Sequence, residues 1–134
     1  MTARRGRPQL LPLTTLIESG MPSDTSELLH GTLDVLVLKT LSWGPVHGYG
    51  ISRWIEQQTG DELQIVDAAL YKALHRLEAS GAIASAWGVS DNNRRAKYYS
   101  LTPRGRRVLR AEAATWKRYA AAVTGILETG VRQS

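Results

Sequence analysis

The amino-acid sequence predicts a mainly α fold with a minor β component, in which a winged helix-turn-helix continues into a long C-terminal dimerisation helix. Three segments with helical spacing of apolar residues precede two strand-like segments joined by a polar turn. A strong helix start then opens a segment with a heptad-like apolar repeat. A chain of 134 residues that is 43% hydrophobic can bury one modest core, so these elements belong to one domain.

The composition divides the chain into three parts. Residues 1–26 are rich in Arg, Pro, Thr and Ser without a sustained period, which predicts a disordered N-terminal arm. Met21 resembles a protein start in its own right, so the arm is either native or an added extension. Residues 27–101 carry the winged helix-turn-helix pattern. Residues 102–134 are expected to form the C-terminal helix and a short tail.

The first two helices are short. Apolar residues between Leu33 and Leu41 recur at helical spacing, and Gly44-Pro45 ends that segment. The second helix is expected to begin near Gly48, to bury Ile51, and to stop at Gly60, a residue suited to the left-handed cap position.

The third helix is expected to begin with Asp67 as its N-cap and to run to Ser80, with Gly81 beyond its end. On a helical wheel its apolar and basic residues separate onto opposite faces. The apolar face carries Leu70, Ala73, Leu74 and Leu77, whereas the opposite face carries Lys72, His75 and Ala79, flanked by Tyr71 and Arg76. The first face is therefore predicted to pack on the core and the second to face a partner or solvent.

A β-hairpin follows the third helix. Residues Ile83 to Val89 favour a strand, Ser90 to Asn93 a polar turn, and Lys97 to Leu101 a returning strand. Three helices followed by such a hairpin are the elements of a winged helix-turn-helix.

The last helix is predicted to start with Thr102 as N-cap and Pro103 at the first helical position, and to extend to about Leu127. Its apolar positions step alternately by four and three, as in a helix packed against another helix. These positions are Leu109, Ala113, Trp116, Ala120, Val123 and Leu127. They predict a homodimer interface, with the alternative that this face folds back on the first helix of its own chain.

Basic residues concentrate between Lys72 and Arg110, where only Glu78 and Asp91 are acidic. The basic residues there are Lys72, Arg76, Arg94, Arg95, Lys97, Arg104, Arg106, Arg107 and Arg110. Together with a formal net charge of +5, this favours a polyanionic partner, double-stranded DNA before a membrane surface. The arginines at positions 4, 5 and 7 of the arm either touch the same DNA or are solvated.

In a helix-turn-helix the third helix enters the major groove, where Lys72, His75 and Arg76 would be the hydrogen-bond donors. The hairpin residues Arg94, Arg95 and Lys97 can reach an adjacent groove or its phosphates. Arg104 belongs to the cluster at the start of the last helix, where cations oppose the helix dipole unless an anion such as phosphate compensates. The alternatives are a solvated basic face, or a protein-interaction module that docks an acidic partner.

The residue types argue against an enzyme, a metal site or a cofactor. The chain has no cysteine, and its histidines, His30, His47 and His75, lie in different elements without metal-ligand spacing. We expect His47 to pack or to cap a helix, and the tryptophans to lie in the core or at an interface. Trp116 on the predicted dimer seam could also line a pocket for a planar aromatic effector.

The sequence predicts neither a membrane span nor a secretory leader. No apolar run approaches the ~20 residues of a spanning helix. The stretch from Leu10 to Ile17 is too interrupted for a leader and lacks a convincing cleavage site. A cytoplasmic location is therefore expected.

Four fragments together resemble a known family, although each fragment alone is weak. They are Gly31–Leu38, His47–Ile51, Ala69–Glu78 and Arg95–Gly105. In this order and spacing, over residues 28–127, the chain resembles the PadR family of bacterial transcriptional regulators. Its single C-terminal helix resembles the short subgroup, which puts a dedicated ligand domain in doubt.

The resemblance implies a dimeric repressor that binds DNA and that responds, as family members often do, to phenolic or other aromatic compounds. It implies that Tyr71 contacts DNA through its hydroxyl, that Lys72 and His75 face the groove, and that Lys97 and Tyr99 serve at the base of the wing. The expected DNA-binding set is then Tyr71, Lys72, His75, Arg76, Arg94, Arg95, Lys97, Tyr99 and Arg104.

Overall fold

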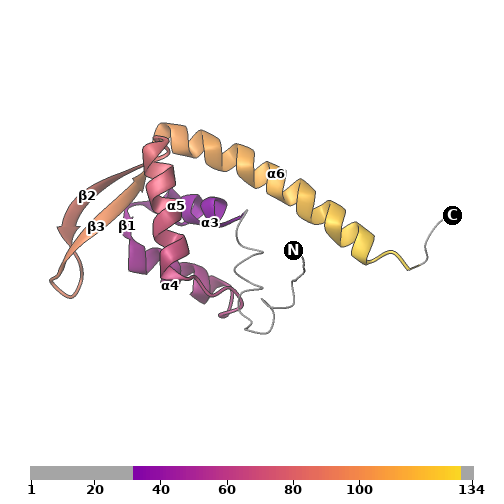
Figure 1. Ribbon diagram of the computed structural model, residues 1–134, viewed down its shortest axis with the longest axis horizontal. Helices are drawn as coiled ribbons and strands as arrows, with labels where there is room; N and C mark the ends of the chain where they lie inside the picture. Colours follow the sequence, from indigo (N-terminus) through magenta and orange to yellow (C-terminus); the bar gives the residue numbers. More distant parts are fainter. Residues whose placement is uncertain (1–31, 131–134) are drawn as a thin grey trace, which may run out of the picture.

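The computed structural model describes residues 32–130, so the arm expected at residues 1–26 lies outside the described residues. The elements are α3 (Leu33–Thr40), the 3₁₀ helix η2 (Leu41–Trp43), β1 (Val46–His47), α4 (Gly48–Gln58), α5 (Asp67–Ala79), β2 (Ile83–Val89), β3 (Arg95–Leu101) and α6 (Pro103–Leu127). Figure 1 shows helices dominating the fold, beside one small sheet. The mainly α winged helix-turn-helix expected from the sequence is confirmed.

Helices α3, α4 and α5 surround the core. Each contributes residues from one helical face, because apolar residues three and four apart lie on the same side of a helix. Leu38 of α3, Ile51 of α4 and Leu70 of α5 are among the most completely buried side chains. Helix α4 ends before Gly60, which has a φ of +57°, a conformation that a residue without Cβ adopts at little cost.

Helix α5 has the expected extent but a different N-cap. Val66 is the cap residue and makes no side-chain cap hydrogen bond, whereas Asp67 is the first residue of the helix. The expectation that Asp67 caps the helix is therefore wrong by one position. Its carboxylate still lies in the first turn, where a negative charge is favoured by the helix dipole. The apolar face predicted for α5 is buried as expected: Leu70, Ala73, Leu74 and Leu77.

The sheet has three antiparallel strands in the order β1-β3-β2. Strands β2 and β3 form the expected hairpin, which is the wing, and pair from Ile83 with Leu101 to Val89 with Arg95. The short strand β1 was not expected from the sequence. It pairs Val46 with Tyr99 and so ties the loop before α4 to the base of the wing.

A single residue connects the wing to α6. Thr102 is the N-cap of α6, and its hydroxyl accepts a hydrogen bond from the Gly105 amide at 3.0 Å. The same hydroxyl donates to the Gly81 carbonyl at 2.7 Å, just beyond the end of α5. The predicted Thr-Pro helix start is thus confirmed, and Thr102 also joins the ends of three elements.

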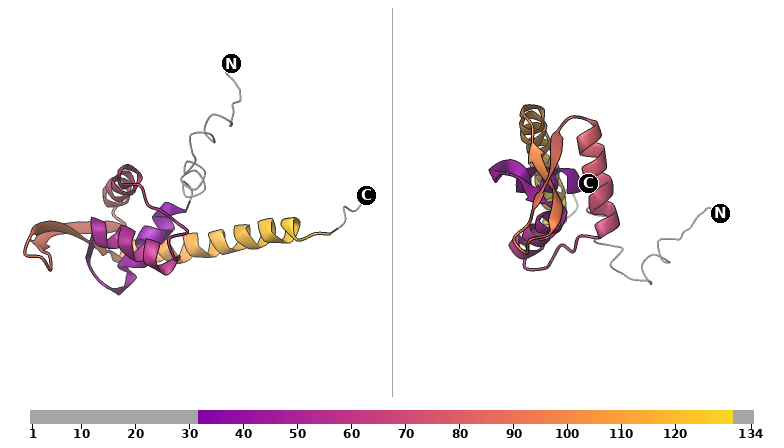
Figure 2. Two further views of the ribbon diagram at one scale, coloured as in Figure 1. Left: turned by 90° about the horizontal axis from the view of Figure 1, so that it is seen from below. Right: turned by 90° about the vertical axis from the view of Figure 1, so that its left-hand side faces the viewer.

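Helix α6 leaves the domain after its first turns. Val108 and Leu109 pack against the core, which agrees with the fold-back alternative for this part of the helix. Farther along, the large side chains of Trp116, Val123 and Leu127 are exposed. Figure 2 shows α6 and the wing projecting from opposite ends of the molecule. None of the helices within residues 32–130 combines the length and apolar character needed to cross a membrane.

Candidate nucleic-acid interface

The outward face of α5 presents the side chains that the sequence placed there. Tyr71, Lys72, His75 and Arg76 are all exposed, and with Ala68 they line a shallow depression. Their exposure follows from the burial of the opposite face, since positions 70, 74 and 77 fix how the helix is turned. Two adjacent donors, Lys72 and His75, thus face away from the core.

Arg76 is already engaged by a partner within the domain. Its guanidinium donates to the Asp34 carboxylate at 2.5 Å and so ties α5 to α3. Arginine carries five N–H donors, and this side chain is 58% exposed, so donors remain for a second acceptor. Its first role in the folded chain is nonetheless to hold two helices together.

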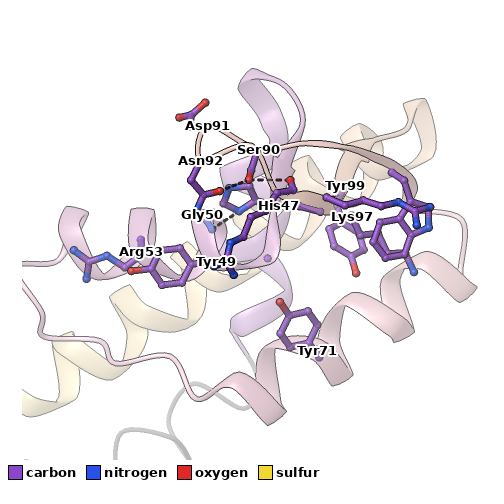
Figure 3. Close-up of a pocket in the computed structure, with 15 residues that line it drawn as sticks. His47, Tyr49, Gly50, Arg53, Tyr71, Ser90, Asp91, Asn92, Lys97 and Tyr99 are labelled. Atoms are coloured by element: carbon purple, nitrogen blue, oxygen red, sulfur yellow. Dashed lines mark hydrogen bonds between the residues drawn. The ribbon is translucent and has the colours of Figure 1, made fainter.

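A larger groove runs between the wing, α4 and α5, with a volume of about 1020 Å³ (Figure 3). Its lining combines aromatic rings, polar groups at the hairpin turn and four cations: Arg53, Arg94, Arg95 and Lys97. Figure 3 shows the Tyr71 ring rising from α5 into this groove. Tyr71 lines both the groove and the depression on α5, so the two surfaces are continuous.

Gly48 sets the position of Tyr71. It is buried at the first position of α4, and a methyl group there would overlap the Tyr71 hydroxyl. Because Gly48 has no Cβ, the hydroxyl end of the Tyr71 ring can lie against the backbone at the start of α4. The sequence pattern predicts Gly48 only as the start of a helix, so it does not predict the contact between Gly48 and Tyr71.

His47 acts as a cap, as expected. Its Nδ1 accepts a hydrogen bond from the Gly50 amide at 2.9 Å, and its ring meets Tyr98 edge-on with centroids 5.4 Å apart. These contacts occupy the imidazole with helix capping and wing packing. Within the described residues, no group of three His, Cys, Asp or Glu side chains could hold a metal ion.

Cross-strand pairing places cations and aromatic rings on one face of the wing. Trp87 lies opposite Lys97, and Val89 opposite Arg95, so all four point to the same side of the hairpin. The guanidinium carbon of Arg95 lies 4.5 Å from the centroid of the Trp87 ring. This is a cation-π contact on an exposed surface.

The base of the wing is held by an ionic and aromatic cluster. Lys97 Nζ lies 3.9 Å from Glu78 and 5.8 Å from the centroid of Tyr99, and Glu78 accepts a hydrogen bond from Ser85 at 2.6 Å. Burial, and then the nearby Tyr71 and Glu78, raise the pKa of Tyr99, so the phenol stays neutral at neutral pH. Tyr99 is only 6% exposed. It is therefore better placed to position Lys97 than to contact DNA itself.

The remaining expected cations lie at the edges of this surface. Arg94 lines the groove beside the hairpin turn, where Asn93 adopts a positive φ of 62°. Arg104 is exposed on the first turn of α6 beside Gly81, outside the groove lining. Among the residues described, no carboxylate pairs with Arg104 or with the other arginines that open α6. The structure thus brings together all the expected residues of α5 and the wing and leaves Arg104 apart.

The tryptophans were expected in the core or at an interface, and two of them lie outside the core. Trp43 is 68% exposed and Trp87 is 60% exposed, so neither belongs to the core. Trp43 packs against the half-buried Trp54, with ring centroids 5.4 Å apart. Residue type alone did not reveal this, since large aromatics are more often buried than exposed.

The helix order, the hairpin and the basic face of α5 define the class of winged helix-turn-helix proteins. Within this class the chain belongs to the PadR family: residues 37–111 match the model of the transcriptional regulator PadR-like family. The resemblance of its four fragments to that family is thereby confirmed.

Solved structures and a sequence relative agree with this assignment. The chain is similar to a PadR family transcriptional regulator from Eggerthella lenta, with 35% identity, a TM-score of 0.67, and coverage of 81% of this chain and 93% of that one. It is also similar to a transcriptional regulator from Clostridium thermocellum, with 28% identity, a TM-score of 0.69, and coverage of 76% and 99%. An uncharacterised protein from Lysinibacillus sphaericus is 35% identical over 68% of this chain and 84% of its own length.

Family membership settles the broad activity. PadR-like proteins are transcriptional regulators that bind DNA, and they are not enzymes. The protein is therefore a DNA-binding transcriptional regulator.

Proposed function

We propose that the protein is a homodimeric repressor that binds a partly palindromic operator in double-stranded DNA. Helix α5 enters the major groove, where Lys72 and His75 donate to base edges and the Tyr71 hydroxyl bonds a phosphate. The wing reaches the adjacent groove with Arg94, Arg95 and Lys97, and Tyr99 keeps Lys97 in place. Arg76 and Arg104 contact phosphates at the margins.

The continuity of the two surfaces at Tyr71 carries this proposal. The depression on α5 and the wing groove share this one side chain, so a single polyanion can cover both. The surface offers exposed cations from two elements with few acidic residues between them. Phosphate contacts of this kind supply affinity, while the donors on α5 supply sequence preference.

The outer half of α6 supports the proposed homodimer. Its exposed apolar side chains recur at helical spacing and include two that the seam pattern omitted, Tyr119 and Ile126. Of the predicted seam, Leu109 packs against the core of its own chain, so the proposed interface runs through Ala113, Trp116, Ala120, Val123 and Leu127. A continuous exposed apolar stripe on a helix marks an interaction surface, and a second copy offers the same stripe. Two paired copies would present two α5 helices to successive major grooves, about 34 Å apart.

Repression follows from occupancy, because a dimer on its operator blocks access by polymerase. An aromatic effector would relieve repression by binding beside Trp116, which is 43% exposed on the proposed interface. A cytoplasmic location follows from the same function, because the DNA of a bacterial cell lies there.

Fluorescence anisotropy of the full-length protein on DNA from upstream of its own gene tests the proposal. Scrambled DNA serves as competitor over a salt series, with Lys72→Ala and Arg95→Ala as variants and Lys117→Ala on exposed α6 as a charge-matched control. We expect preference for the upstream DNA, a loss of about tenfold for Lys72→Ala, and a steep salt dependence of about 0.9 in log–log slope per neutralised phosphate.

Other outcomes separate the alternatives. Equal, weak binding to both DNAs would remove the autoregulated operator from the proposal. Absence of binding to any duplex at low salt would favour a module whose basic face docks an acidic protein. An unchanged affinity of both interface variants, with Lys117→Ala equally silent, would contradict the assigned surface.

A further inference from the structure

The exposed Trp87 on the wing has no role in the core. It lies in the middle of β2, at the position paired with Lys97, and lines the groove with 60% of its surface exposed. An exposed aromatic ring can still contribute to a binding surface when a cation lies over its face. Its neighbour on that face is Arg95.

The guanidinium of Arg95 lies over this ring. Arg95 is the first residue of β3, beside the hairpin turn, and its side chain is exposed. No carboxylate in the described part of the chain forms an ion pair with it, whereas Arg76 and Lys97 each have one. The Trp87 ring, 4.5 Å from the guanidinium carbon, is the contact that holds the side chain along the hairpin. A ring can orient a guanidinium without neutralising its charge or occupying its N–H donors.

We propose that Trp87 is a positioning residue for DNA binding, which acts by holding the Arg95 guanidinium against the wing, oriented for a DNA groove. Arginine side chains lose much rotamer freedom when they bind, and prior stacking on Trp87 removes part of that loss. This inference rests on the proposed function, since it requires Arg95 to contact DNA. It assigns to Trp87 a part of the affinity that charge counting attributes to Arg95 alone.

A double-mutant cycle on the full-length protein tests the inference. The Kd for operator DNA is measured for wild type, Trp87→Ala, Arg95→Ala and the double variant, with Trp87→Phe as a conservative replacement. Val89→Ala is the matched control, because Val89 is an exposed apolar residue on the same face, directly opposite Arg95. Thermal unfolding of each variant verifies that the wing is folded.

We expect Trp87→Ala to raise the Kd about two- to fivefold, Trp87→Phe to recover part of this loss, and Val89→Ala to change little. In the Arg95→Ala background, Trp87→Ala should have no further effect, because the guanidinium that it positions is gone. The salt slope should fall by about 0.9 for Arg95→Ala but stay unchanged for Trp87→Ala, which keeps every charge.

Two results would overturn the inference. One of them leaves the proposed function intact, and the other contradicts it as well. If Trp87→Ala weakens binding equally in both backgrounds, Trp87 touches DNA directly and the proposed interface stands. If Arg95→Ala alone leaves Kd and salt slope unchanged, the wing contact of the proposed function fails together with the inference.

Discussion

The wing and the outer half of α6 both project from the same core and both expose aromatic residues, but their surroundings differ. On the wing, Trp87 lies against Arg95 and Tyr99 near Lys97. On α6, Trp116 and Tyr119 share their exposed surface with apolar residues, and no cation-ring contact occurs there in the part of the chain described.

The neighbours of an exposed ring indicate what kind of partner it can bind. A ring beside a cation forms a surface that can attract a polyanion while retaining an apolar contact, as the wing would. A stripe of rings and aliphatic side chains without cations gains free energy only by burial against another apolar surface, as the outer half of α6 would. The chain therefore exposes surfaces suited to two kinds of interface: one substitution should affect both of them, and two others should affect one each.

The largest effect is expected where the two regions join. A methyl group at Gly105 would overlap the Ala82 carbonyl oxygen, and backbone atoms cannot move aside cheaply. Gly105→Ala should lower the free energy of unfolding by about 3 kcal/mol and weaken dimerisation and DNA binding together. Urea denaturation measures the change.

Gly125→Ala is the control, because a methyl group there meets open space on the same helix. This variant should stabilise the protein by roughly 0.5–1 kcal/mol. Equal stability of the two variants would contradict the packing of α6 on the domain.

The next effect isolates α6. Val123→Glu places an unpaired charge on the proposed seam and should raise the dimer dissociation constant about 100-fold or more. Ala121→Glu introduces the same charge on the exposed opposite face and should leave the dimer intact. Light scattering coupled to size exclusion reports the mass of each variant. A dimer that survives Val123→Glu would place the contact between copies elsewhere.

The smallest effect isolates the DNA side. Gly48→Ala should push the Tyr71 ring out of its position without unfolding α4, because only the tip of one side chain must move. We expect about fivefold weaker operator binding, the value of a weakened hydrogen bond to a charged group, and an unchanged dimer. In a Tyr71→Ala background, Gly48→Ala should cost nothing more. A further loss in that background would mean that Gly48 acts through the start of α4 and not through Tyr71.

Most of the fold can be predicted from the sequence, because its signals are local and repeat along the chain. The faces of α5 follow from the spacing of Leu70, Leu74 and Leu77, and the start of α6 from Thr102-Pro103. Strand β1 cannot be predicted in this way, since two residues carry no period. It forms only because β3 offers an unpaired edge beside it.

The cations of the site can be predicted from the sequence, but the residues that they contact within the folded chain cannot. Exposure of Lys72 and His75 follows from the helical wheel. The Arg76 pair with Asp34 and the overlap of Gly48 with Tyr71 join residues far apart in the chain. Tyr99 shows the same limit, because its burial depends on where β1 and β2 flank β3. Such contacts depend on tertiary packing, which periodicity does not encode.

Thr102 couples α6 rigidly to the wing and to the end of α5. With only one residue between β3 and the helix, and with that residue bonded to the end of α5, the helix cannot pivot without turning the wing and α5 with it. A helix of 25 residues is about 37 Å long. In a pair of copies joined along their outer halves, the lever arm is about 28 Å, so a tilt of about 10° between the two helices would change the separation of the two DNA-binding domains by about 5 Å, more than one base-pair step.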